Sequence, residues 1–295
     1  MTVQHSPTGR LASIFDACRA EGRAALIGYL PTGYPDVPIS IEAMVAMCES
    51  RCDIIEVGVP YSDPGMDGPV IATATEIALQ SGVRVSDTLR AVEAISAAGG
   101  KAVVMTYWNP VLHYGVDAFA RDLAAAGGLG MITPDLIPDE AEAWLAASQH
   151  HGLDRIFLVA PSSTPERLAR TVEASRGFSY AASTMGVTGA RDVVSQAAPD
   201  LVRRVREISD IPVGVGLGVR SAQQAAEIAH FADGVIVGSA LVSALGGSAL
   251  GGSAPGGSAR GDSALGDSAS GDGVAAVRTL TEELAAGVRE RVPAT

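Results

Sequence analysis

Positive charge is scarce in this sequence of 295 residues. Lysine and arginine together number 21 against 33 aspartates and glutamates, which leaves a formal net charge of −12. Proteins that bind nucleic acid present a basic surface to the phosphate backbone, so this balance argues against a nucleic-acid partner. We interpret the acidity itself as a contribution to solubility.

Cysteines and long hydrophobic runs are also few. The three cysteines, Cys18, Cys48 and Cys52, form no CxxC pair, which favours a reducing compartment. The first ten residues show no basic region followed by an apolar stretch, and no uncharged apolar run approaches about 18 residues, so neither a signal peptide nor a membrane span is predicted. With 47% hydrophobic residues the chain can build a large core. We therefore expect a soluble, cytoplasmic protein.

Short apolar runs alternate with segments of helical periodicity along most of the chain. The runs are apolar on both faces, which is typical of parallel strands covered on both sides. Eight such units in about 250 residues predict a closed (β/α)8 TIM barrel. A doubly wound open sheet is the alternative, although no GxGxxG follows the first run. The predicted strands are Ala25–Leu30, Asp53–Val57, Ala102–Tyr107, Leu129–Thr133, Arg155–Val159, Phe178–Ala182, Pro212–Val215 and Gly234–Val237.

An additional helix, Arg10–Glu21, precedes the first strand and is placed to close the floor of the barrel. Pro38 and Pro165 suit the first turns of later helices, and Ser86 and Ser221 suit N-caps. The helices predicted between the strands include Ile39–Glu49, Asp87–Ala98, Val116–Ala126, Asp139–His150, Pro165–Ala174 and Ser221–Ala229.

The stretch Ser243–Asp272 breaks this pattern by repeating a five-residue unit six times: SALGG, SALGG, SAPGG, SARGD, SALGD and SASGD. A segment of this composition cannot bury enough apolar area to offset its chain entropy, so we predict a flexible insertion within the single domain 1–295. A repeat solenoid is the alternative, but the unit lacks a regular large apolar residue to stack. Val274–Arg291 then resumes a helical pattern and supplies the last barrel helix.

The stretch Glu56–Pro69, EVGVPYSDPGMDGP, holds the leading candidates for chemistry. Active sites of these barrels lie at the C-terminal ends of the strands, where Glu56 ends the second strand and Asp63 and Asp67 follow in its loop. Burial should raise the pKa of Glu56, whereas Asp67 on a loop can stay more solvated and ionised, so the two can divide acid and base roles. Alternatively, Glu56 is a paired strand-end acid and Asp67 caps the helix that begins near Pro69.

Glycine-rich turns follow the last two predicted strands, at Gly214–Gly218 and at Val237–Ser239, before a short helix predicted at Ser239–Ser243. Barrels often bind phosphate here, because glycines let backbone N–H groups approach an anion that the helix dipole also favours. Glycines that only turn the chain are the alternative.

The remaining polar motifs are less specific. Met185–Ala190, after the sixth strand, has the length and glycine content of a mobile lid, and equally of an ordinary surface loop. The five histidines show no HxxxH or HxH spacing, so no metal site is predicted. The single lysine, Lys101, precedes the third strand, at the wrong end for a Schiff base. The residues together indicate acid–base chemistry on a phosphorylated small molecule.

Glu56–Pro69 closely resembles the signature of tryptophan synthase alpha subunits, E-[LV]-G-x-P-[FY]-S-D-P-x-x-D-G-P. The similarity covers residues 10–242 and the final helix, and includes Tyr29–Pro31, Tyr107–Pro110, Ile132–Asp135, Tyr180, Gly186–Ala190, Gly216–Gly218 and Gly238–Ser239. The resemblance implies a lyase of L-tryptophan biosynthesis that cleaves indole-3-glycerol phosphate to indole and glyceraldehyde 3-phosphate. It also implies an α2β2 assembly, in which the beta subunit carries pyridoxal phosphate and the alpha subunit has no cofactor.

The resemblance also implies residue roles. Glu56 matches the general acid/base, Asp67 the carboxylate that accepts the indole N–H, and Tyr180 a tyrosine near the catalytic acid. Thr188 matches a lid threonine, and Leu217 matches an apolar residue against the indole. The implied substrate-binding residues are Tyr29, Thr188, Gly189, Gly216, Leu217, Gly218, Gly238 and Ser239, of which Gly189, Gly216, Gly218, Gly238 and Ser239 hold phosphate.

Three departures from the family pattern stand out. Gly65 replaces a bulky apolar residue, which should loosen the loop that holds Asp67, and Ala72 replaces a glutamine. The third is the repeat, because the family connects that point in a few residues. A non-catalytic barrel that activates a partner, and another phosphate-binding barrel enzyme such as an isomerase, are the alternatives.

Overall fold

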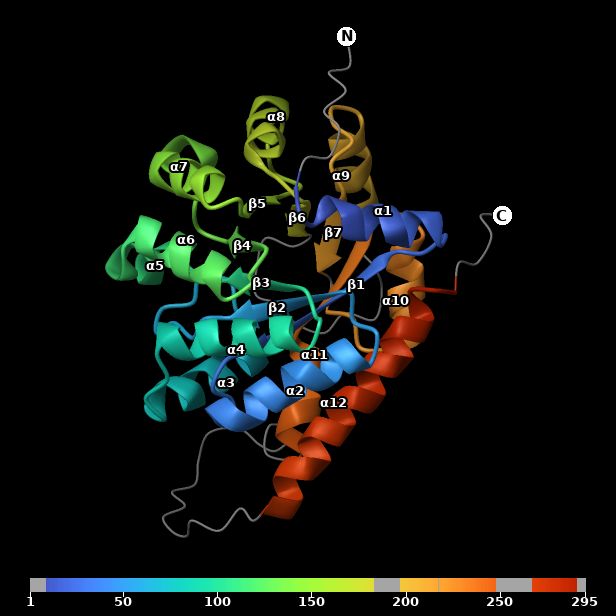
Figure 1. Cartoon of the computed structure of the whole chain (residues 1–295). Coiled ribbons are helices and arrows are strands. Elements are labelled where there is room, and N and C mark those ends of the chain that lie inside the picture. Colours follow the sequence, from blue (N-terminus) through green and yellow to red (C-terminus); the bar gives the residue numbers. More distant parts are fainter. Residues whose placement is uncertain (1–8, 183–196, 217, 248–266, 291–295) are drawn as a thin grey trace.

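The computed structural model describes residues 9–182, 197–216, 218–247 and 267–290. Its strands pair in chain order, all of them parallel, and β8 returns to β1, so the sheet is a closed barrel surrounded by helices (Figure 1). The predicted (β/α)8 barrel is confirmed. The strands are β1 (Ala25–Pro31), β2 (Ile54–Gly58), β3 (Ala102–Met105), β4 (Gly130–Thr133), β5 (Asp154–Val159), β6 (Ser179–Ala182), β7 (Val213–Gly216) and β8 (Gly234–Val237).

Three of the four predicted helix start signals are observed. Pro38 and Pro165 lie in first turns, and the Ser221 hydroxyl accepts the N–H of Gln224, as predicted. Ser86 as an N-cap is wrong, because that helix begins at Val85 and its N-cap is Arg84. The carboxylate of Asp87 accepts the backbone N–H of Arg84 at 2.9 Å. The helices are α1 (Ala12–Ala20), α2 (Val37–Glu49), α3 (Pro69–Gln80), α4 (Val85–Ala97), α5 (Trp108–Tyr114), α6 (Val116–Ala125), the 3₁₀ turn η1 (Pro138–Glu140), α7 (Glu142–His150), α8 (Pro165–Ala174), α9 (Ala197–Arg206), α10 (Ala222–Ala229), α11 (Ser239–Gly246) and α12 (Asp267–Gly287).

One core fills the inside of the barrel, and α1 closes its floor. Leu11, Phe15 and Cys18, from α1 and the residue before it, are buried against inward-facing strand residues, and the rings of Phe15 and Phe178 lie 5.4 Å apart. The carboxylate of Asp154, at the start of β5, accepts the N–H of Leu11 at 2.8 Å. The predicted role of the N-terminal helix is confirmed. The strand residues of this core include Ile27, Ile54, Val103, Ile132, Ile156 and Ile236.

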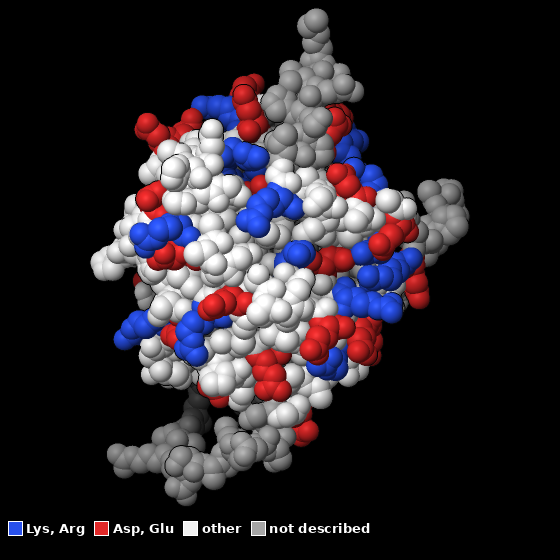
Figure 2. Space-filling model, in the orientation of Figure 1, with Lys and Arg blue, Asp and Glu red and all other residues white. Residues whose placement is uncertain are grey.

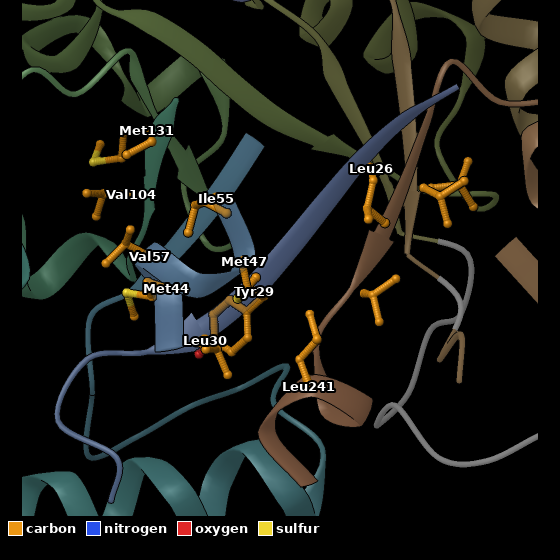
Figure 3. Packing of buried hydrophobic residues seen from close by; sticks show 14 of the residues in the cluster. Leu26, Tyr29, Leu30, Met44, Met47, Ile55, Val57, Val104, Met131 and Leu241 are labelled. Carbon is orange, nitrogen blue, oxygen red and sulfur yellow. The ribbon is translucent and has the colours of Figure 1, made fainter. Parts of the chain in front are cut away.

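A second core lies between the strands and the outer helices, which explains why the strands are apolar on both faces. Figure 3 shows part of this cluster, with Leu30 of β1, Met47 of α2 and Leu241 of α11. Gly28 of β1 allows the close approach, because a Cβ atom there would lie 3.1 Å from the Cys52 sulfur and 3.2 Å from a Leu241 methyl carbon. The two cores fix the strands and therefore the loops at their ends.

The ends of the five-residue repeat are helical, which corrects the predicted bounds of the insertion. Ser243–Gly246 complete α11, because Leu245 is buried in the outer core with 5% of its surface exposed, and Asp267–Asp272 belong to α12. Residues 248–266 lie outside the described residues, so a flexible insertion there stays a prediction.

Charged side chains of both signs are interspersed on the face shown in Figure 2. Several of them pair, and the buried guanidinium of Arg23 contacts both carboxylate oxygens of Asp53 at 2.7 and 2.9 Å. In the described part of the chain, none of the helices combines the length and apolar character needed to cross a membrane.

Candidate active site

Glu56 lies inside the barrel near its mouth. Side chains two residues apart on a strand share a face, so Glu56 points inward like Ile54, and it pairs in register with Tyr29 on β1 and Val103 on β3. Only 2% of Glu56 is exposed, and its Oε2 atom has no hydrogen-bond partner among the described residues. Burial, and secondarily the charge of Asp67, raises the pKa of Glu56 to about 8. The predicted pKa rise is confirmed, and the group is largely protonated at neutral pH.

Asp67 lies in the loop between β2 and α3. It is half-buried and therefore more exposed than Glu56, as predicted. The hydroxyl of Tyr107 donates a hydrogen bond to its Oδ1 atom at 3.1 Å. Burial nevertheless raises the pKa of Asp67, and the Tyr107 hydrogen bond opposes that rise. The third acid of this stretch, Asp63, is exposed and accepts a hydrogen bond from the Ser62 hydroxyl at 2.5 Å.

Two tyrosines face the same space as the two carboxylates. Tyr29 on β1 is 8% exposed, and Tyr180 on β6 is half-buried at the edge of the inner core. Burial raises the pKa of each phenol, and the charges of Glu56 and Asp67 raise it further. The structure therefore brings the four predicted groups Tyr29, Glu56, Asp67 and Tyr180 together at the mouth.

Two of the predicted glycines, Gly216 at the end of β7 and Gly238 after β8, lie beside these tyrosines. A Cβ atom added at Gly216 would lie 2.7 Å from the Tyr180 hydroxyl oxygen, and one at Gly238 would lie 3.4 Å from the Tyr29 ring. Gly218 has a φ of +67°, a left-handed conformation that favours glycine. Ser239, half-buried, is the first residue of α11. Thr188, Gly189 and Leu217 lie outside the described residues.

Tyr107 is a site residue to which the sequence interpretation gave no role, although it belongs to a stretch that carries the resemblance. It directly precedes α5, is 6% exposed, and its ring centroid lies 5.2 Å from that of Tyr61 in the β2–α3 loop. The available signal was its position just after β3, because every strand of such a barrel ends at the mouth. Among the described residues there is no group of three or more histidine, cysteine or acidic side chains that could hold a metal ion.

The departures at Gly65 and Ala72 leave the two carboxylates in place. Gly65 is exposed, and a Cβ atom there would meet nothing within 4 Å, so the position is open rather than packed. Ala72 lies in the first turn of α3, where its N–H donates to the Gly68 carbonyl at 2.9 Å.

The mouth of this (β/α)8 barrel therefore gathers a buried glutamate of raised pKa and a second carboxylate, an arrangement that suits an enzyme of acid–base chemistry. The family model for the tryptophan synthase alpha chain matches residues 15–253. The chain is 73% identical over 294 residues to the tryptophan synthase alpha chain of Mycobacterium avium (strain 104), a match that covers 100% of both chains. It therefore belongs to the tryptophan synthase alpha chain family.

Solved structures agree with this assignment. A chain in the structure of Mycobacterium tuberculosis tryptophan synthase is 72% identical, with a TM-score of 0.85 over 96% of this chain and 99% of that one. The tryptophan synthase alpha chain of Legionella pneumophila subsp. pneumophila is 27% identical, with a TM-score of 0.80 over 95% and 97%. The chain is an indole-3-glycerol-phosphate lyase of tryptophan biosynthesis, and the alpha chain's reaction needs no cofactor.

Proposed function

We propose that Glu56 and Asp67 carry the acid–base steps of indole-3-glycerol phosphate cleavage, with Tyr180 beside them. The observation that supports this role for Glu56 best is its buried Oε2 atom without a hydrogen-bond partner among the described residues. A buried polar atom without a partner is costly, so a ligand that uses it recovers that cost on binding. With a pKa of about 8, Glu56 holds a proton at neutral pH that it can donate to the bound substrate as a general acid.

The cleavage balances with one carboxyl group. The Glu56 carboxylic acid gives its proton to carbon 3 of the indole ring, and positive charge develops at the ring nitrogen. The Asp67 carboxylate accepts a hydrogen bond from the ring N–H and stabilises that charge. The glycerol hydroxyl on the adjacent carbon then gives its proton to the Glu56 carboxylate while the carbon–carbon bond breaks. The bond electrons return to the ring, indole leaves, glyceraldehyde 3-phosphate forms, and Glu56 is protonated again.

The glycine turns are proposed to hold the phosphate. Backbone N–H groups at Gly189, Gly216, Gly218 and Gly238, with Ser239 at the start of α11, would surround it, and the α11 dipole favours its charge. Gly216 and Gly238 support this role because they lie against Tyr180 and Tyr29, next to the carboxylates. The remaining substrate contacts are proposed from Tyr29 and Leu217 at the indole and from Thr188 as a lid residue.

The chain works within the tryptophan synthase complex with a beta subunit, which carries the pyridoxal phosphate. The indole is proposed to pass to that subunit. We further propose an α2β2 stoichiometry and a cytoplasmic location, the latter because all three cysteines are free. The segment 248–266 is proposed to be a flexible insertion of the single barrel domain.

The test is indole release from indole-3-glycerol phosphate by a Glu56→Gln variant, with and without the beta subunit. Glutamine keeps the shape of the side chain and cannot shuttle a proton, so kcat should fall by at least about 100-fold while substrate still binds. Asp154→Asn is the matched control, since it neutralises another buried acid at the opposite end of the barrel. Its folded protein should keep kcat. Near-normal turnover in Glu56→Gln would refute the assignment.

A further inference from the structure

The hydroxyl of Tyr107 connects two neighbouring loops at the mouth. It accepts a hydrogen bond from the N–H of Met66 at 3.0 Å and donates one to Oδ1 of Asp67 at 3.1 Å. Its ring also lies against that of Tyr61, from the same β2–α3 loop. One buried side chain therefore contacts this loop at both ends, and one of its hydrogen bonds ends on the proposed catalytic carboxylate.

Tyr107 is itself held by hydrogen bonds with residues that follow β3 and β4. The buried hydroxyl of Thr106 donates to the Tyr107 carbonyl at 3.0 Å. The next N–H, that of Trp108, donates to both carboxylate oxygens of Asp135, at 2.9 and 3.2 Å, and Asp135 follows β4. These hydrogen bonds hold the peptide group that follows Tyr107, and before it the N–H of Thr106 donates to the Ile132 carbonyl of β4 at 3.2 Å, so the Tyr107 backbone has a defined position.

The loop that carries Asp67 needs such support from outside. Gly65, two residues before Asp67, has the conformational freedom of glycine and open space around it. Met66 is exposed, with 39% of its surface accessible, so its side chain does not anchor the loop in a core. The Tyr107 hydroxyl takes the N–H of Met66 and the carboxylate of Asp67 directly after this flexible point.

We infer that Tyr107 is a positioning residue for cleavage, which fixes the Asp67 carboxylate toward the indole N–H, and that Asp135 braces it through the Trp108 N–H. This inference rests on the proposed role of Asp67. Misplacing a catalytic group by about 1 Å costs on the order of 100-fold in rate, so positioning of this kind is large enough to measure.

Tyr107→Phe tests the inference, because it keeps the ring and its packing and removes both hydrogen bonds. We expect kcat for indole formation to fall about 10- to 100-fold, with KM changed less than about threefold. Loss of the donor raises the pKa of Asp67, so the acid limb of the kcat–pH profile should move to higher pH. A raised KM with unchanged kcat would overturn the inference, since Tyr107 would then serve binding alone.

Tyr114→Phe is the matched control. The Tyr114 hydroxyl donates to Asp122 at 2.8 Å, so the variant removes the same kind of hydrogen bond between α5 and α6, away from the carboxylates. It should keep both kcat and the acid limb. A loss equal to that of Tyr107→Phe would mean that the effect is a general consequence of removing such a bond, and would overturn the inference.

Asp67→Asn separates this inference from the proposed function. If Asp67→Asn keeps wild-type kcat, the role of Asp67 itself is wrong. If Asp67→Asn abolishes cleavage while Tyr107→Phe leaves kcat and the acid limb unchanged, only the positioning inference fails. The double variant should be no slower than Asp67→Asn, because Tyr107 acts through Asp67, and a further multiplicative loss would overturn the inference.

The brace is tested at Asp135. Asp135→Ala should lower kcat in the same direction as Tyr107→Phe, because Trp108 loses its acceptor. Asp135→Asn should restore kcat, since the amide oxygen still accepts the Trp108 N–H. An equal loss in both variants would show that Asp135 acts through its charge, and would overturn this part of the inference.

Discussion

Burial of Glu56 should leave a pH-dependent mark on the stability of the whole protein. The folded state raises the pKa of this group from 4.5 to about 8, so between these values the folded chain holds a proton that the unfolded chain has released. The contribution of Glu56 to stability is therefore fully present below pH 4.5 and is lost as the pH rises through 8. In Glu56→Gln the side chain stays neutral at every pH, so the variant does not lose this part of its stability as the pH rises.

The magnitude follows from the proton balance. One extra proton in the folded state lowers the free energy of unfolding by about 1.4 kcal/mol per pH unit. Over the whole window from 4.5 to about 8 the upper bound is on the order of 5 kcal/mol. Because domains are stable by only about 5–15 kcal/mol, this difference is large enough to measure.

The assay is urea unfolding of the wild-type chain and of Glu56→Gln at several pH values, with the difference in unfolding free energy as the readout. Taking the difference cancels the contributions of Asp154 and of the other titrating groups that do not interact with Glu56. We expect the variant to gain stability relative to the wild type as the pH rises, most steeply between about pH 5 and 8. A difference that does not change with pH would mean that the pKa of Glu56 is the same in the folded and the unfolded chain, and the raised pKa would then be wrong.

Three further predictions concern the phosphate turn, the repeat and the barrel floor. Gly218→Ala and its control Gly99→Ala both place a side chain at positive φ with open space around it, so each should lower the unfolding free energy by about 1–2 kcal/mol. Only Gly218→Ala should weaken the binding of glycerol phosphate, measured by calorimetry. Equal binding by both variants would mean that Gly218 only turns the chain. Replacing residues 248–266 with a short connector should leave the thermal midpoint and indole release nearly unchanged, since the free-energy cost of loop closure changes by only about 0.6 kcal/mol per doubling of length. Loss of folding in this variant would show that the segment is structural. Phe15→Ala should lower the unfolding free energy by about 3–5 kcal/mol, because the ring fills the barrel floor against Phe178. The folded variant should keep its kcat. A loss of stability below about 1 kcal/mol would mean that the floor is not tightly packed.

The barrel was predictable because its signals are local. Apolar runs such as Gly234–Val237 match the observed strand, Glu56 lies within the strand that was predicted for it, and Asp67 lies in the loop that follows. Individual side-chain contacts, whether local or between distant residues, were not predictable in this way. The start of α4 depends on which backbone N–H the Asp87 carboxylate accepts, and the end of α11 depends on a core that holds Leu245.

The site was predictable in its residues and less so in its interactions. Sequence position indicated that Glu56 would be buried, because a side chain near the end of a barrel strand and on its inward face is surrounded by the side chains inside the barrel. It did not indicate that burial also raises the pKa of Asp67, or that a tyrosine after β3 donates to that carboxylate. Such interactions depend on the packing of the β2–α3 loop against Tyr107, which no periodicity encodes.

Burial makes Glu56 an acid that keeps its proton at neutral pH, and the proposed cleavage depends on that proton. The most direct measurement is an NMR titration of the chain labelled with ¹³C at its glutamate carboxyl groups, with Glu56→Gln used to assign the resonance. We expect the resonance missing from the variant to titrate with a midpoint near 8. A midpoint near 4.5, the ordinary value for a glutamate, would contradict it.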